Sequence, residues 1–175
     1  VRKIINEMPM LDYEAEDGIV YPSIVNLQNT EIENVIKQRF SEIWPNFKSS
    51  KIFARYSFEQ VKPPNWAHSD KEMTQMLALI YLNESDRKSK TYLLEHETGF
   101  RTHPESLMER KMLLGDSNNT FKWKITQSLE GRDNSCWVMN SDFIHAAGFG
   151  PLSTGSIMPI FCIGLTLPTS FELKE

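Results

Sequence analysis

Residues 66–83 read WAHSDKEMTQMLALIYLN, and this stretch sets the expected fold. Its second half, residues 76–82, is a continuous apolar run followed by the polar residues 83–86, which predicts a buried strand and a turn. Its first half contains His68 and Asp70, two residues apart. Residues i and i+2 of an extended strand point to the same face, so this imidazole and this carboxylate could converge on one metal ion.

A third metal ligand must come from elsewhere, and His145 is the best candidate among the four histidines. Small residues follow it at 146–148, which leaves room for a ligand. Two histidines and one carboxylate form a facial triad with three open positions, which suits non-haem Fe(II) oxygen chemistry. A divalent cation with one carboxylate keeps a charge of about +1 and favours an anionic co-substrate. A hydrogen-bonded His–Asp pair near a strand end is the alternative interpretation of residues 68–70.

Strands dominate the rest of the chain. The sequence predicts them at residues 51–59, 76–82, 91–94, 121–125, 136–139 and 157–167. Helices are predicted at residues 31–44, where Thr30 and Glu33 form a capping box, and at 104–114. We expect one mainly β (α+β) domain over residues 1–175, a sandwich or jelly-roll barrel with helices packed outside. Residues 1–50 would form an N-terminal segment and supporting helix.

Composition narrows the class of protein. The chain has 175 residues, a formal net charge of −4 and 40% hydrophobic residues, typical of a soluble globular domain. The acidic balance disfavours nucleic acid as a partner, and no apolar run approaches the ~20 residues that span a bilayer. The first residues show no signal-peptide pattern, so we expect a cytoplasmic protein. Cys136 and Cys162 lie in apolar stretches and are predicted to be buried free thiols. The sequence carries no signal for oligomeric state.

Four segments occur in an order that resembles a known family. They are residues 55–58 (RYSF), 68–70 (HSD), 79–83 (LIYLN) and 139–145 (MNSDFIH). Residues 52–167 resemble the 2-oxoglutarate- and Fe(II)-dependent dioxygenases, most of all the prolyl-hydroxylase-like branch with its small phage and marine bacterial members. The resemblance implies a double-stranded β-helix, a cupin-like jelly roll, with Fe(II) on His68, Asp70 and His145. It also implies 2-oxoglutarate as co-substrate and hydroxylation of a small-molecule or peptidyl substrate. Tyr56 matches a tyrosine that lines the co-substrate pocket.

The sequence departs from this family at one position. The family places an Arg or Lys about ten residues after its distal metal-binding His, where it pairs with the far carboxylate of 2-oxoglutarate. Residues 152–158 contain no basic side chain. Lys90 or another cation from a neighbouring strand could replace it, or Thr154, Ser156 and Tyr56 could bind the carboxylate as neutral partners. The third alternative is a protein that keeps the metal without the oxygenase activity, a cupin-like metal-binding module or a silent scaffold.

Three further side chains, those of His96, His103 and Trp66, each allow two interpretations. His96 and His103 are expected to be exposed polar loop residues near the substrate entrance, and a second metal site is the alternative. Trp66 is expected to pack in the core, and lining the metal site is its alternative role.

Overall fold

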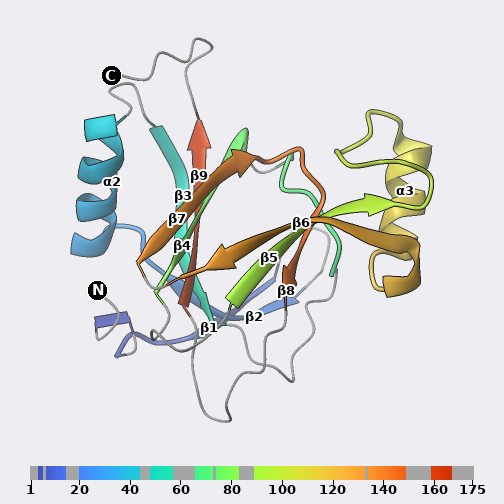
Figure 1. Ribbon diagram of the computed structural model, residues 1–175. Coiled ribbons are helices and arrows are strands. Elements are labelled where there is room, and N and C mark those ends of the chain that lie inside the picture. Colours follow the sequence, from blue (N-terminus) through green and yellow to red (C-terminus); the bar gives the residue numbers. More distant parts are fainter. Residues whose placement is uncertain are drawn as a thin grey trace.

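The computed structural model describes residues 4–5, 7–14, 20–43, 48–56, 66–72, 74–82, 89–132, 134–148 and 159–166. This part of the chain is mainly β, as the sequence predicts (Figure 1). Its strands are β1 (Leu11–Glu14), β2 (Val20–Asn26), β3 (Lys48–Tyr56), β4 (Met76–Tyr81), β5 (Ser89–His96), β6 (Trp123–Gly131), β7 (Ser135–Asn140), β8 (His145–Gly148) and β9 (Pro159–Thr166). Its helices are α2 (Glu31–Ile43), α3 (Leu107–Asp116) and the 3-10 turn η1 (Thr120–Lys122).

The strands form two antiparallel sheets. The larger sheet has the order β1-β2-β3-β9-β4-β7, and the smaller has the order β6-β5-β8. Strand β9 therefore lies between β3 and β4, although it follows both in the chain. Beside the smaller sheet, His68 forms an isolated antiparallel bridge with His145. In Figure 1, α2 lies against the larger sheet, and α3 lies at the opposite side of the molecule.

The two faces of strand β4 pack into two different hydrophobic clusters. Leu77, Leu79 and Tyr81 pack with residues of β5, β6 and β7, so this face lies between the two sheets. Ala78 and its neighbours on the other face pack in a cluster with residues of β2, β3 and α2. A period of two residues is the normal consequence of strand geometry. The continuous apolar run seen in the sequence is therefore buried on both faces.

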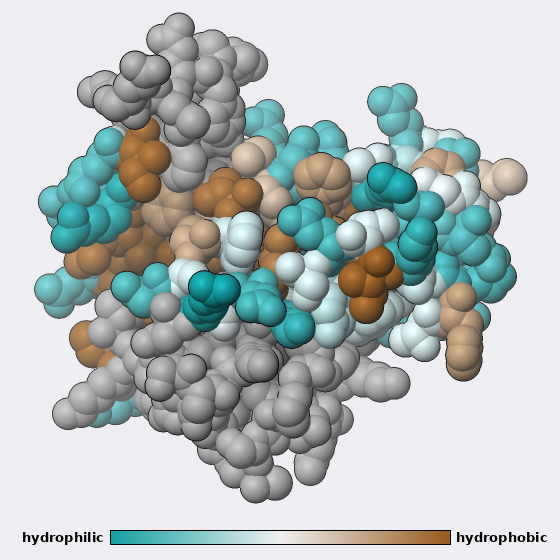
Figure 2. Space-filling view, viewed as in Figure 1, coloured by the Kyte–Doolittle hydropathy of each residue, from teal (hydrophilic) through white to brown (hydrophobic). Residues whose placement is uncertain are grey.

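Helix α2 begins where its capping signal predicts, but only half of the predicted capping box forms, because the Thr30 N–H donates to the Leu27 carbonyl instead of to Glu33. The Glu33 N–H donates to Thr30 Oγ1 at 3.2 Å, and the Glu33 carboxylate accepts the backbone N–H of Asn29. The helix buries Ile32, Ile36 and Phe40 against the larger sheet, whereas Val35 and Ile43, which the helical period also assigns to the apolar face, are exposed. Figure 2 shows hydrophilic side chains along the outer side of this helix and hydrophobic ones beneath it.

Several sequence expectations need correction. Helix α3 begins at Leu107 rather than at 104, after Ser106 in an extended conformation, and it continues through Gly115. Strand β6 begins at Trp123, because η1 occupies the preceding residues, and it runs to Gly131.

Two side chains also lie differently from their predictions. Cys136 is a free thiol on an exposed residue, although burial around its sulfur raises its pKa to about 11. The Cys162 side chain lies outside the described part. His96 is buried rather than exposed, because β5 extends to that residue. In the described residues, no helix is long and apolar enough to cross a membrane.

Candidate metal centre

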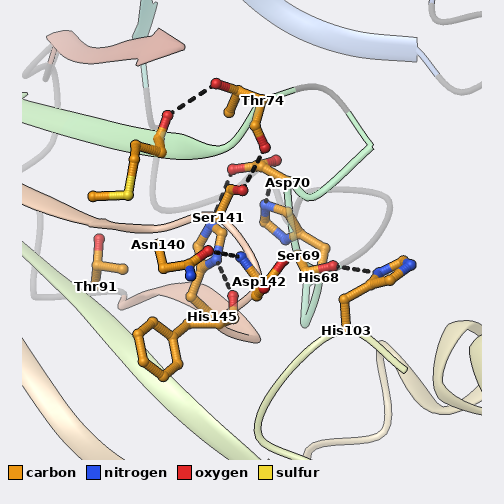
Figure 3. A network of polar contacts seen from close by, with 12 residues as sticks. His68, Ser69, Asp70, Thr74, Thr91, His103, Asn140, Ser141, Asp142 and His145 are labelled. Carbon is orange, nitrogen blue, oxygen red and sulfur yellow. Dashed lines mark hydrogen bonds and ion pairs between the residues drawn. The ribbon is translucent and has the colours of Figure 1, made fainter. Parts of the chain in front are cut away.

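The structure brings His68, Asp70 and His145 together (Figure 3). One ligand atom from each lies within 4.8 Å of the other two. His145 Nε2 is 3.4 Å from Asp70 Oδ2, and His68 Nε2 is 4.0 Å from Asp70 Oδ1. The two imidazole rings are tilted by 53°, with centroids 4.5 Å apart. The three side chains therefore face one common point from two segments of the chain.

Backbone hydrogen bonds hold these two segments side by side. The His68 N–H donates to the His145 carbonyl at 3.0 Å, and the His145 N–H donates to the His68 carbonyl at 2.8 Å. The Asp70 N–H donates to the Ser141 carbonyl at 3.0 Å. Residues 68 and 70 then present their side chains to one face, as an extended segment requires. Main-chain pairing thus places the two segments that carry His68, Asp70 and His145 next to each other.

Both histidines have the same tautomer preference. His68 Nδ1 lies 3.2 Å from the Trp66 carbonyl, and His145 Nδ1 lies 3.0 Å from the Phe143 carbonyl. A carbonyl accepts only, so each Nδ1 carries the proton and donates it. Each Nε2 is then left with its lone pair toward the common point. Fixing a ligating histidine through its second nitrogen is the usual arrangement in metal sites.

The site is largely shielded from solvent. The side chains of Asp70 and His145 are 9% and 6% exposed, whereas that of His68 is 28% exposed, so an ion would approach from the His68 side. Burial alone would lower the pKa of His145, but the Asp70 carboxylate and the Phe143 carbonyl outweigh it and raise that pKa. A metal ion must displace the proton that His145 takes up below its pKa. The apparent affinity for the metal should therefore fall as the pH drops through the His145 pKa.

The donor set fits a divalent ion. Two neutral imidazole nitrogens and one carboxylate are the ligands that Fe(II), Zn(II) and related ions take. Bonds of about 2.1 Å at right angles would place neighbouring ligand atoms about 3 Å apart. The observed separations of 3.4 Å and 4.0 Å, and that of the third pair, which lies within 4.8 Å, would have to shorten toward this value when an ion binds. Ligation from one face leaves the remaining coordination positions to small molecules.

Polar contacts support the segment that leads to His145. Ser141 is fully buried, and its N–H donates to the Gln75 carbonyl at 3.1 Å. Asn140 Oδ1 accepts the Asp142 N–H at 2.9 Å. The Asp142 carboxylate forms an ion pair with Lys71 at 2.6 Å, which links the residue after Asp70 to this segment. These contacts connect both ligand-bearing segments at their ends.

The residues predicted to bind the co-substrate are less well placed. Lys90 lies on the outer face of the smaller sheet, because Thr91 and Leu93 face inward, and its ammonium is 3.9 Å from Glu130. Lys90 therefore does not join the metal centre. The backbone of Tyr56 pairs with Pro159 on β9, its side chain is not described, and Thr154 and Ser156 lie outside the described residues.

Sequence reasoning missed a hydroxyl pair between the two sheets. Tyr81 on β4 and Thr91 on β5 are both buried, and their oxygens are 2.6 Å apart. Thr91 pairs with Ala147, two residues beyond His145 on β8 and on the same face. A tyrosine inside an apolar strand was the available signal, since a buried hydroxyl needs a partner. These hydroxyls lie inside the fold on the side that His145 faces.

The other histidines and Trp66 have separate surroundings. His96 contacts Thr98 and Asp116, whereas His103 contacts Ser69, so these two histidines do not form a second metal site. Trp66 packs against the cluster around Leu94 and Trp123 and donates its indole N–H to the Ala147 carbonyl at 3.1 Å, as its predicted packing role requires.

Comparison with protein-family models, with curated proteins and with solved structures found no match to this chain.

Proposed function

We propose that this protein is an Fe(II)- and 2-oxoglutarate-dependent oxygenase with a double-stranded β-helix fold. The observation that carries the proposal is the arrangement of His68, Asp70 and His145. Both imidazoles donate Nδ1–H to a carbonyl, and both direct Nε2 toward the Asp70 side of the cluster. This is a facial set of two nitrogens and one oxygen with open positions for small molecules.

The path of the chain supports the fold. From β3 in the larger sheet the chain passes to residues 68–70 beside β8, and then returns to the larger sheet at β4. It continues to β5 and β6 in the smaller sheet, to β7 in the larger, to β8 in the smaller and to β9 in the larger. Repeated exchange between two facing antiparallel sheets is what a jelly roll requires. The core of Leu77, Leu79, Tyr81, Leu129 and Met139 would fill its interior.

The metal and the protein would divide the work. Bound Fe(II) would activate dioxygen in a reaction coupled to decarboxylation of 2-oxoglutarate. The chain contributes one carboxylate ligand, so the centre keeps positive charge and attracts an anionic co-substrate. Buried Asp70 and His145 limit water around the centre, and the more exposed His68 marks the open side.

The interior hydroxyls offer a partner for the far carboxylate. Thr91 faces inward opposite Ala147, which places it about 7 Å along the strand direction from His145. That spacing suits a five-carbon dicarboxylate held by the metal at one end. Because one hydroxyl proton is used in the bond between Tyr81 and Thr91, the other hydroxyl of the pair would donate to the far carboxylate as a neutral partner, whereas Lys90 lies on the outer face. Neutral partners give weaker recognition than an Arg fork, so we expect a modest affinity.

A cupin-like metal-binding module without oxygenase activity is the second candidate. The outward position of Lys90 and its contact with Glu130 favour it, because the most direct cationic replacement does not reach the interior. Both candidates share the three metal ligands and differ in whether 2-oxoglutarate binds.

Anaerobic titration separates the two candidates. The Fe(II)-loaded protein is titrated with 2-oxoglutarate, and the weak visible charge-transfer band of the chelate is followed. A band that appears and saturates supports the oxygenase, whereas bound iron without a band supports the metal-binding module.

The ligand assignment is tested with two variants of the same segment. His145→Ala should abolish tight Fe(II) binding, since two ligands from one short segment hold an exchangeable ion poorly. Phe143→Ala is the matched control, because its side chain is exposed and its carbonyl remains. Unchanged metal content in His145→Ala would refute the assignment.

A further inference from the structure

His103 touches both segments that carry the metal ligands. Its Nδ1 is 2.8 Å from Ser69 Oγ, and Ser69 lies between His68 and Asp70 in the chain. Its backbone N–H donates to the Asp142 carbonyl at 2.8 Å, within the segment that leads to His145. Figure 3 shows His103 on the far side of Ser69 from the ligand cluster.

We propose that His103 is a positioning residue for the metal centre and acts through the Ser69 hydroxyl. The inference depends on the proposed metal-binding function and adds a residue that contacts neither the ion nor any ligand side chain. Its role would be to set the orientation of the segment that presents His68 and Asp70.

The geometry explains why Ser69 is an effective point of attachment. On an extended segment the side chain of residue 69 points away from those of 68 and 70. Main-chain bonds from His68 and Asp70 hold the segment along one edge, and the Ala67 N–H holds its start on the Ser117 carbonyl at 3.0 Å. In our proposal these bonds still permit residues 68–70 to rotate about the axis of the segment. Such a roll would move both ligands together. A bond to Ser69 on the opposite face resists the roll and holds both ligands at once.

His103 itself is oriented by surrounding groups. Its side chain is 19% exposed, and its Nε2 is 3.9 Å from Glu72 Oε1. The same Glu72 oxygen is 2.9 Å from Arg110 Nη1, and Arg110 also donates to the Glu105 carbonyl at 2.9 Å. Glu72 is largely exposed, so this ion pair contributes little by itself. The bond that matters for the metal centre is the one between His103 and Ser69.

The test measures metal affinity in a small set of variants. His103→Ala and Ser69→Ala should each raise the dissociation constant for Fe(II) or Co(II) about ten- to a hundredfold, as loss of an outer hydrogen bond does in other metal sites. The double variant should be no weaker than either single variant, because both remove the same bond. His103→Asn should restore most of the affinity, since an amide can reach Ser69 from the Nδ1 position.

Two further measurements separate positioning from general stability. The visible spectrum of bound Co(II) should change in His103→Ala and recover in His103→Asn, because it reports the ligand geometry. Thr102→Ala is the matched control, since Thr102 is an exposed neighbour of His103 that pairs through its backbone with Phe143. The metal affinity of this variant should equal that of the unmodified protein.

The results also distinguish this inference from the proposed function. Unchanged affinity in His103→Ala, additive losses in the double variant, or no rescue by His103→Asn would each overturn the positioning role. If His145→Ala abolishes metal binding while His103→Ala leaves it unchanged, only this inference fails. If His145→Ala retains the metal, the proposed centre fails as well.

Discussion

Removing the two hydroxyls between the sheets should reveal a strong energetic coupling. Tyr81 and Thr91 are 0% and 4% exposed, with oxygens 2.6 Å apart. Tyr81→Phe or Thr91→Val deprives a buried polar group of this partner, which costs about 1–3 kcal/mol. Replacing both removes the two polar groups together and is close to neutral in such pairs. We therefore expect the double variant to lose at least about 2 kcal/mol less than the sum of the single variants.

Equilibrium unfolding in urea of all four proteins measures this cycle. The slopes of the unfolding curves should stay constant, so that differences in midpoint report free energy of unfolding. In thermal unfolding each kcal/mol should shift Tm by about 2–4 °C for a chain of this size. Tyr92→Phe is the control, because Tyr92 lies on the other face of β5. Its free energy of unfolding should stay within about 0.5 kcal/mol of that of the unmodified protein. A double variant whose loss equals the sum of the single losses would refute the coupling.

The same variants address the co-substrate. If the hydroxyl pair binds the far carboxylate, Thr91→Val should weaken 2-oxoglutarate binding without changing Fe(II) affinity. Equal co-substrate affinity in Thr91→Val and the unmodified protein would remove the pair from the proposed site.

Two further predictions concern stability. The Lys37 ammonium lowers the pKa of Glu33 below its ordinary 4.5, and the backbone N–H of Asn29 lowers it further. Together these two groups outweigh burial, which acts in the opposite direction. Glu33→Gln should therefore cost about 1 kcal/mol at pH 7, and this difference should shrink as the pH falls from 4.5 through the lowered pKa. Urea unfolding at a series of pH values from 7 downward checks this. In Gly131→Ala the new Cβ would lie 2.5 Å from Tyr81 Cε1, so the ring must shift, and the free energy of unfolding should fall by about 1–3 kcal/mol. Gly115→Ala is the control, because its new Cβ meets open space on a helix and should not destabilise the fold.

Features set by neighbouring residues could be predicted from the sequence. Helix α2 starts where Thr30 and Glu33 predict, because a capping box and a helical period are both local. The shared face of His68 and Asp70 likewise follows from their spacing of two. His145 lies 75 residues after Asp70 (145 − 70), and the small residues after it were enough to select it. That these three side chains bind a metal stays a prediction.

Features set by the register of distant strands could not be predicted. Whether Lys90 or Thr91 faces the interior depends on how β5 pairs with β6 and β8, which no local pattern reveals. His96 is buried because β5 continues two residues past the expected end, which brings its ring edge-on to Trp123. The contact between Ser69 and His103 joins residues 34 positions apart and has no signature in either segment.

The central place of β9 in the larger sheet has a consequence for synthesis of the chain. Strands β3 and β4 both pair with β9, and residue 159 is made 78 residues after residue 81 (159 − 81). At about 5–20 residues per second the ribosome needs on the order of 4–16 s to cover that distance. During this interval β3 and β4 each carry an open edge that can pair with another nascent chain. Expression at low temperature or with a chaperone that shields such edges should therefore raise the yield of folded protein, because the sheet closes only when its middle strand arrives.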